Sequence, residues 1–172
     1  DGIRDLVRSR GLGDVYKRQT LENIDAFIFD FDGVLTNNLV FVDQDGKESV
    51  CCNRSDGLAF DVLKKLKKPS YILSTEKNPI VSARAKKLNI QAIQGVKDKT
   101  QELLILAKTN GYNLNRVLYV GNDINDYKVM KLCGYSACPS DSHEKIRSIA
   151  TFVLQKKGGN GVIRELLEVN LN

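Results

Sequence analysis

Two carboxylates stand two residues apart near the start of this chain. Asp30 and Asp32 follow the apolar run 26–29 and precede a glycine at position 33. Residues i and i+2 of an extended strand face the same side, so both carboxylates converge where the strand ends. Such a pair repels unless a cation compensates it, and Mg²⁺ binds carboxylate oxygens while leaving positions for phosphate. The pattern indicates phosphoryl transfer with Asp30 as nucleophile and Asp32 as acid and base, although an exposed acidic turn would have the same local sequence.

Three more polar sites follow predicted strands farther along the chain. They are Ser74, Lys99 and the oxygen-rich segment 121–126. A hydroxyl and a lysine at strand ends can bind phosphate oxygens, because ligands of open α/β sheets bind at that edge. Each has a plainer interpretation, as a helix cap, a solvated lysine and an acidic helix start, respectively. Those local interpretations do not explain why all four sites follow successive strands in this order.

With these motifs the chain resembles the haloacid dehalogenase superfamily, over about residues 24–167. It is similar in particular to the capless 3-deoxy-octulosonate 8-phosphate phosphatases and to the phosphatase-like domain at the carboxyl end of acylneuraminate cytidylyltransferases. The segments that carry the resemblance are 30–36, 53–57, Gly95 with Lys99, 119–123 and 158–165.

The resemblance implies a role for each matching position. Asp30 is the expected nucleophile and Asp32 the acid/base, and Ser74 and Lys99 are expected to bind the transferred phosphoryl group. The implied metal is Mg²⁺, with ligands from Asp30, Asp32, Asn122 and Asp123. The positions expected to contact substrate are Asn53, Arg54, Asp56, Gly57 and Arg84. The implied activity is hydrolysis of a small sugar-acid phosphate, of the nonulosonate 9-phosphate or octulosonate 8-phosphate type, through an aspartyl phosphate.

Two positions depart from the octulosonate phosphatase pattern. Gly121-Asn122-Asp123 replaces Gly-Asp-Asp, and an amide oxygen can bind Mg²⁺ but brings no negative charge. Thr75-Glu76 replaces Gly-Arg, which puts an anion where a cation would face the substrate. Both departures favour the cytidylyltransferase-associated branch. They keep open an alternative function, a weakly active or inactive oligomerisation or regulatory domain of an acylneuraminate cytidylyltransferase.

Alternating strands and helices must position these residues. We predict strands at 26–31, 70–73, 91–93, 117–120, 135–137 and 152–153, and helices at 56–66, 79–88, 99–110, 125–133, 143–148 and 161–169. This alternation predicts an α/β fold, a Rossmann-like parallel sheet flanked by helices on both faces. In the first helix, the spacing of Leu58, Val62 and Leu66 predicts an apolar stripe that faces the sheet.

Residues 38–52 interrupt the alternation. Two apolar runs flank Asp43-Gln44-Asp45-Gly46, which predicts a β-hairpin. In the resembled subfamily such a hairpin is a flap that joins a homotetramer, in which a neighbouring subunit helps to close the site. No large cap domain is expected, so water would be excluded by assembly.

Residues 1–19 are best set apart from the fold. Their segment 9–19 resembles the translation of a transposase adapter used in sequencing libraries, so we interpret 1–19 as a non-native segment and 20–172 as the phosphatase-like domain. A native basic leader is the less favoured interpretation. If adapter sequence abuts Thr20, an upstream cytidylyltransferase domain is a possible lost fusion partner. Positions 1–19 carry +2 of the net charge of +5.

Composition argues against several other classes of protein. The remaining mild positive charge suits a small anionic substrate and gives no reason to expect nucleic acid as a partner. The four cysteines lack metal-ligand spacing, which favours reduced thiols in a cytoplasmic protein. No apolar stretch is long enough to suggest a membrane span. The single histidine, His143, makes a zinc site or a serine triad implausible, and a loop or cap role is expected for it.

Overall fold

A computed structural model describes residues 23–171. Its centre is a six-stranded parallel sheet with the strand order β5-β4-β1-β6-β7-β8. The strands are β1 (Ala26–Phe29), β4 (Ser70–Leu73), β5 (Gln91–Ile93), β6 (Val117–Val120), β7 (Tyr135–Cys138) and β8 (Phe152–Val153). Strands β1 and β6 are buried along their whole length, as expected where helices cover both faces of a parallel sheet. The predicted α/β class is confirmed.

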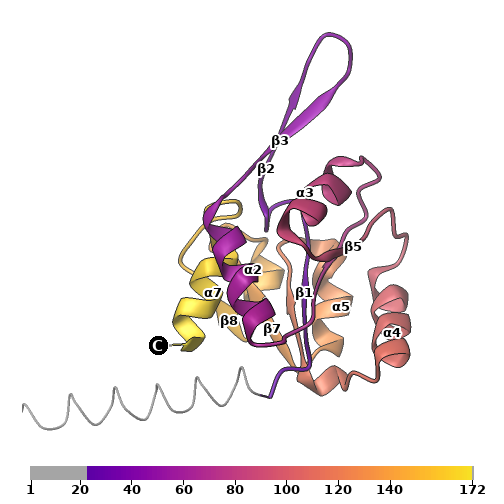
Figure 1. Cartoon of the computed structure of the whole chain (residues 1–172), viewed down its shortest axis with the longest axis vertical. Coiled ribbons are helices and arrows are strands. Elements are labelled where there is room, and N and C mark those ends of the chain that lie inside the picture. Colours follow the sequence, from indigo (N-terminus) through magenta and orange to yellow (C-terminus); the bar gives the residue numbers. More distant parts are fainter. Residues whose placement is uncertain (1–22, 172) are drawn as a thin grey trace, which may run out of the picture.

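Helices cover both faces of this sheet (Figure 1). The core on one face takes Phe27 and Phe29 of β1, and the core on the other takes Ala26 and Ile28, because successive strand residues point to opposite sides. The first core contains residues of α2 (Ser55–Lys65), α3 (Ile80–Leu88) and α7 (Val162–Leu171). The second contains residues of α4 (Lys99–Asn110), α5 (Tyr127–Leu132) and α6 (Glu144–Arg147).

The sheet register brings the expected site residues to one edge. Phe29 of β1 pairs with Ile72 of β4 and with Val120 of β6. Because the three strands are parallel, the residues that follow them, Asp30 and Ser74 among them, emerge at the same end of the sheet.

Helix α2 buries a different face from the one predicted. Leu58 and Leu66 are 57% and 45% exposed, and the helix packs through Ala59, Phe60 and Leu63 instead. Spacing alone allowed either stripe. Contact with α7 and with Phe29 selects the stripe that contains Phe60. The Phe29 and Phe60 rings meet edge-on, with 5.2 Å between their centroids. The predicted stripe was therefore wrong at Leu58 and Leu66, whereas Val62 is partly buried against the core.

The predicted hairpin is present as β2 (Thr36–Val42) and β3 (Glu48–Cys52), joined by a turn in which Gly46 has φ +76°. Figure 1 shows it projecting beyond the sheet edge that carries the site. Four consecutive apolar residues of β2, positions 39–42, are exposed. The insertion between β1 and α2 is this small hairpin, as expected for a fold without a large cap.

Several element bounds agree with the predicted ones, and the differences lie at the ends of strands and helices: β1 ends at Phe29 instead of residue 31, and β7 extends to Cys138 instead of ending at residue 137. Strands β4, β5, β6 and β8 and helix α4 match the prediction. The helix expected at 125–133 instead starts as a 3₁₀ turn, Ile124–Asp126, followed by α5. The proposed non-native segment 1–19 lies outside the described residues. Within 23–171, the structure contains no helix with the length and apolar character of a membrane span.

Candidate active site

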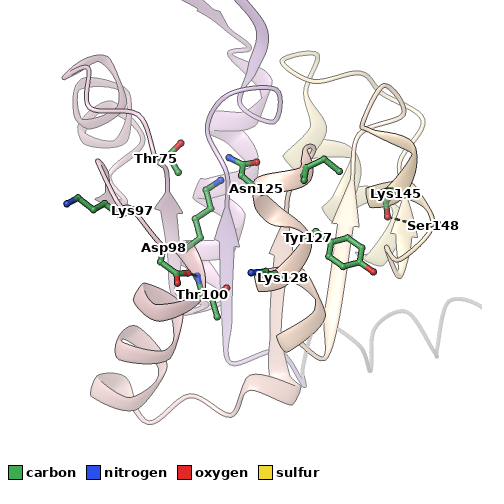
Figure 2. A pocket seen from close by; sticks show the side chains of 11 residues that line it. Thr75, Lys97, Asp98, Thr100, Asn125, Tyr127, Lys128, Lys145 and Ser148 are labelled. Atoms are coloured by element: carbon green, nitrogen blue, oxygen red, sulfur yellow. Dashed lines mark hydrogen bonds between the residues drawn. The ribbon is translucent and has the colours of Figure 1, made fainter.

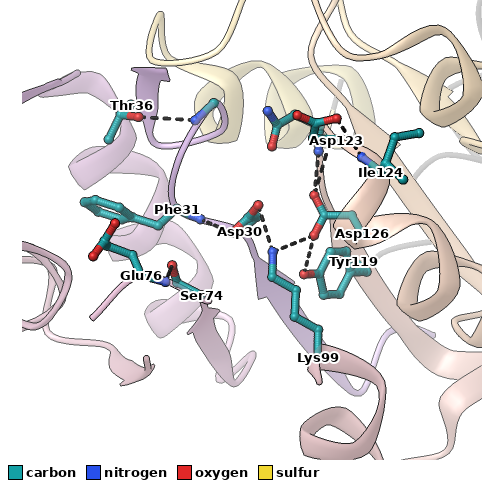
Figure 3. Close-up of polar contacts among 12 residues, drawn as sticks. Asp30, Phe31, Thr36, Ser74, Glu76, Lys99, Tyr119, Asp123, Ile124 and Asp126 are labelled. Carbon is teal, nitrogen blue, oxygen red and sulfur yellow. Dashed lines mark hydrogen bonds and ion pairs between the residues drawn. The ribbon is translucent and has the colours of Figure 1, made fainter. Parts of the chain in front are cut away.

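Lys99 forms ion pairs with two aspartates of the candidate site. Its Nζ lies 2.9 Å from Asp30 Oδ2 and 2.7 Å from Asp126 Oδ1, and all three side chains are buried (Figure 3). Asp98 caps helix α4 by accepting the backbone N–H groups of Thr100 and Gln101, which fixes Lys99 at the first helical position. Burial lowers the pKa of Lys99, but the two carboxylates outweigh burial and raise it, so the lysine carries its charge.

Asp126 organises the loop after β6, a role that its sequence position did not reveal. Its Oδ1 accepts the Tyr119 hydroxyl at 2.9 Å as well as Lys99, while its Oδ2 accepts the backbone N–H of Asn122 at 2.9 Å. A Cβ at Gly121 would lie 2.6 Å from the Asp126 Cβ, so only glycine fits there. The available signals were a tyrosine in the strand and an aspartate four residues after Asn122.

Asp30 lies in a strongly polarised environment. Its Oδ1 accepts the backbone N–H of Phe31 at 2.7 Å, and its Oδ2 contacts Lys99. Burial, with the neighbouring charge of Asp126, raises the pKa of Asp30 to about 8, although Lys99 opposes this shift. A further cation beside Asp30 would favour the ionised carboxylate that a nucleophile needs.

Asp32 is half-buried and lies in the turn after β1, two residues beyond Asp30. Burial, with the charge of Glu76, raises its pKa above the ordinary value of 3.8. A raised pKa suits a carboxyl group that must both donate and accept a proton near neutral pH. The turn is held by the hydroxyl of Thr36, which accepts the N–H of Gly33, and by Gly33 itself at φ +78°.

Ser74 is buried directly after β4. Its Oγ accepts the backbone N–H of Glu76 at 3.1 Å, so its own hydroxyl proton stays available as a donor. The neighbouring Thr75 lines the same pocket as Asp30 and Asp32. Sequence reasoning assigned no individual site role to Thr75, Asn38, Ile124 or Asn125 of this pocket lining, although the segment 121–126 that it singled out contains Ile124 and Asn125.

The pocket at the sheet edge has a volume of about 270 Å³. The oxygen atoms of its side chains are of the type that binds Mg²⁺. Its lining includes Asp30, Asp32, Asn122 and Asp123. The Oδ1 atom of Asn122 is buried and has no hydrogen-bond partner, so a cation would satisfy it. Asp123 is exposed at the rim and uses its Oδ1 to accept the N–H of Ile124. Among residues 23–171 no group of three His, Cys, Asp or Glu side chains is placed to hold a metal ion by itself.

None of the five residues expected to contact substrate, Asn53, Arg54, Asp56, Gly57 and Arg84, is in the lining of this pocket. Arg54, Gly57 and Arg84 line a separate cavity of about 440 Å³, and Arg84 Nη2 donates to the Asn53 carbonyl at 2.8 Å.

Asp56 has a structural role within the fold. It is fully buried, and its Oδ1 accepts the backbone N–H groups of Ile163 and Arg164 at 3.0 and 3.3 Å. It thus satisfies free donors at the start of α7, and it offers no exposed surface to a substrate. His143 is also a cap: its Nδ1 accepts the N–H of Lys145 at the start of α6, as expected.

Comparisons with known proteins agree with this geometry. Residues 58–166 match the family model of haloacid dehalogenase-like hydrolases. The chain is 30% identical over 154 residues to the 3-deoxy-D-manno-octulosonate 8-phosphate phosphatase of Yersinia pestis, an alignment that covers 89% of this chain and 82% of the relative.

Solved structures share the fold. A putative hydrolase of this superfamily from Streptomyces avermitilis has a TM-score of 0.86 and 41% identity, covering 88% of this chain and 87% of that one. The octulosonate 8-phosphate phosphatase of Moraxella catarrhalis, solved with magnesium, phosphate and the sugar acid, has a TM-score of 0.84 and 29% identity, with coverages of 90% and 92%. The chain therefore belongs to the haloacid dehalogenase-like hydrolases, and it is an enzyme of the phosphatase type.

Proposed function

We propose that this enzyme hydrolyses a small sugar-acid phosphate, of the nonulosonate 9-phosphate or 3-deoxy-octulosonate 8-phosphate type, through an aspartyl phosphate on Asp30. One observation carries the mechanistic part of this proposal. A buried lysine, Lys99, contacts the Asp30 carboxylate at 2.9 Å beside a pocket that also holds Asp32 and the unpartnered Asn122 amide oxygen. The names of the curated relatives support the substrate class.

The side chains can perform the reaction in two steps. In the first, an Asp30 oxygen attacks phosphorus while the bond to the sugar oxygen breaks and Asp32 gives that oxygen a proton. In the second, Asp32 takes a proton from water, the water oxygen attacks phosphorus, and inorganic phosphate leaves with Asp30 restored. Ser74 and Lys99 would hold the phosphoryl oxygens throughout. Bound Mg²⁺, held by Asp30, Asp32 and Asn122 with Asp123 at the rim, would neutralise charge on the transferring group.

The exposed hairpin supports a proposal about the oligomeric state. Positions 39–42 expose Leu-Val-Phe-Val in a row, with Leu39 62% and Phe41 65% exposed. Such a strip is costly in water, and burying it between subunits is favourable. We propose a homotetramer in which the hairpin covers the site of a neighbouring subunit, where Asn53, Arg54, Gly57 and Arg84 would meet substrate. We also propose that this enzyme associates with a cytidylyltransferase.

Replacing the nucleophile tests the reaction. Asp30→Asn removes the attacking oxygen but keeps a carbonyl acceptor for Lys99, so the fold should persist while turnover is lost. Phosphate release from octulosonate 8-phosphate and nonulosonate 9-phosphate with Mg²⁺ measures activity, and circular dichroism measures folding. Wild-type rates in a folded Asp30→Asn variant would refute the nucleophile assignment.

A second candidate function is an inactive regulatory module, and the amide at Asn122 with the carboxylate at Glu76 favours it. An uncharged third ligand weakens metal binding, and Glu76 lies close enough to Asp32 to raise its pKa. The two candidates differ in one measurable outcome. A module of this kind shows no Mg²⁺-dependent turnover with any sugar-acid phosphate.

A further inference from the structure

The walls on the two sides of the catalytic pocket carry opposite charge. On the hairpin side lies a small cavity of about 70 Å³ whose lining includes Asp32, Glu48 and Glu76 and contains no lysine or arginine. Glu76 is held there by its Oε1, which accepts the backbone N–H of Lys77 at 2.6 Å and of Asn78 at 2.7 Å. This acidic wall disfavours a second anionic group of the substrate on the hairpin side.

On the other side a larger cavity of about 720 Å³ adjoins the catalytic pocket. The two share Thr75, Ile124 and Asn125 in their linings, so a ligand bound at Asp30 can extend from one into the other. The lining of the larger cavity contains Lys97, Lys128 and Lys145 in addition to the buried Lys99. We call it the lysine cavity.

The charges of the lysine cavity are free to bind a ligand. Across the part of the chain that the structure describes, no salt bridge involves Lys97, Lys128 or Lys145. Asp98 is the one carboxylate in the lining, and its Oδ1 is occupied by two N–H groups of α4. Figure 2 shows Lys128 extending from α5 toward Asp98 and Thr100 at the start of α4, and Lys145 beyond Tyr127 on the other side of α5.

We propose that the lysine cavity, chiefly through Lys128 and Lys145, binds a second anionic group of the substrate while its phosphate lies at Asp30. The acidic wall excludes that group from the hairpin side, and the shared lining leads it toward the lysines. This inference rests on the proposed phosphatase function and adds to it the orientation of the substrate. A carboxylate at the end of a short polyol chain has the required chemistry.

A matched pair of substrates isolates the second anion. 6-Phosphogluconate and sorbitol 6-phosphate have the same chain length and differ at the far carbon, which is a carboxylate in one and a hydroxymethyl group in the other. The wild-type enzyme should prefer the carboxylate, by about tenfold in kcat/KM at low ionic strength. In the variant with both Lys128→Gln and Lys145→Gln, this ratio should fall toward one. Added salt should also lower the wild-type ratio, because these lysines are exposed.

Lys108→Gln is the control, since Lys108 is exposed on α4 and absent from the cavity lining. It should leave the ratio as in wild type. A wild-type ratio near one, or a ratio that survives the double substitution, would overturn the lysine cavity and leave the phosphatase function standing. If wild type hydrolyses neither ester, the activity proposal loses support. In that case, calorimetric titration of 6-phosphogluconate and of sorbitol 6-phosphate into the wild-type protein decides the inference, and equal affinities would count against it.

Discussion

Lys99→Met is the most informative single substitution in this molecule. Methionine keeps an unbranched apolar side chain of similar length and removes the ammonium group. Lys99 Nζ lies within 2.9 Å of Asp30 Oδ2 and 2.7 Å of Asp126 Oδ1, so one change leaves two buried carboxylates without their cation. The effect therefore reports on charge compensation more than on packing.

The size of the effect follows from the remaining contacts. Removing one partner of a buried ion pair costs about 3–5 kcal/mol. Asp126 keeps the Tyr119 hydroxyl and the Asn122 N–H, whereas Asp30 keeps only the Phe31 N–H. Asp30 can take up a proton instead, since burial and Asp126 already raise its pKa to about 8. Protonation limits the loss, so we expect about 3 kcal/mol at pH 8 without Mg²⁺.

Urea unfolding measures this loss. The sign of its pH dependence follows from the raised pKa of Asp30, which rises further without Lys99. At lower pH the folded protein holds the proton and the penalty shrinks, so the difference from wild type should be smaller at pH 6 than at pH 8. Mg²⁺ should restore part of the stability by binding the folded state.

The exposed Lys108→Met on the same helix provides the control and should change stability little. A Lys99→Met protein that unfolds at the wild-type urea concentration at pH 8 would refute the reasoning. So would a destabilisation that is equal at pH 6 and pH 8, because it would indicate lost packing.

Three further predictions concern other parts of the site. Asn122→Asp should tighten Mg²⁺ binding by about tenfold through a third carboxylate, measured by calorimetry, and unchanged affinity would argue against Asn122 as a ligand. Burial raises the pKa of Asp56 to about 6, so the contribution of this carboxyl group to the free energy of unfolding should fall as pH rises from about 4 to about 6. Asp56→Asn should flatten that part of the pH profile of stability measured by urea unfolding. An unaltered profile would contradict this account. A Cβ at Gly158 would lie 2.1 Å from the Gly33 carbonyl oxygen, so Gly158→Ala should lower the free energy of unfolding by about 1–3 kcal/mol and lower kcat. Gly57→Ala is the control, because the nearest atom to its Cβ would lie 3.7 Å away, and it should not destabilise the protein. Equal stability of the two variants would contradict this prediction.

Much of the framework was predictable from the sequence alone. Apolar runs that end in chemically active residues indicate parallel strands, and parallel strands bring their carboxyl ends to one edge. This reasoning predicted that Asp30, Ser74, Lys99 and Asn122 would lie at that edge. The close contact of Asp30 with Lys99, and the shared pocket of Asp30 and Asn122, agree with it. Those inferences need only local periodicity and the direction of the chain.

Tertiary structure alone decided which partners those residues meet. Leu58 was expected inside and is exposed, because packing against α7 selects the buried face of α2. Asp56 was expected at the substrate and instead caps α7, 107 residues away in sequence. Asp126 gained its role through Lys99, 27 residues away, and the lysine cavity exists only where α4, α5 and α6 meet. Burial and charge pairing depend on elements that are distant in the chain, so local patterns do not determine them.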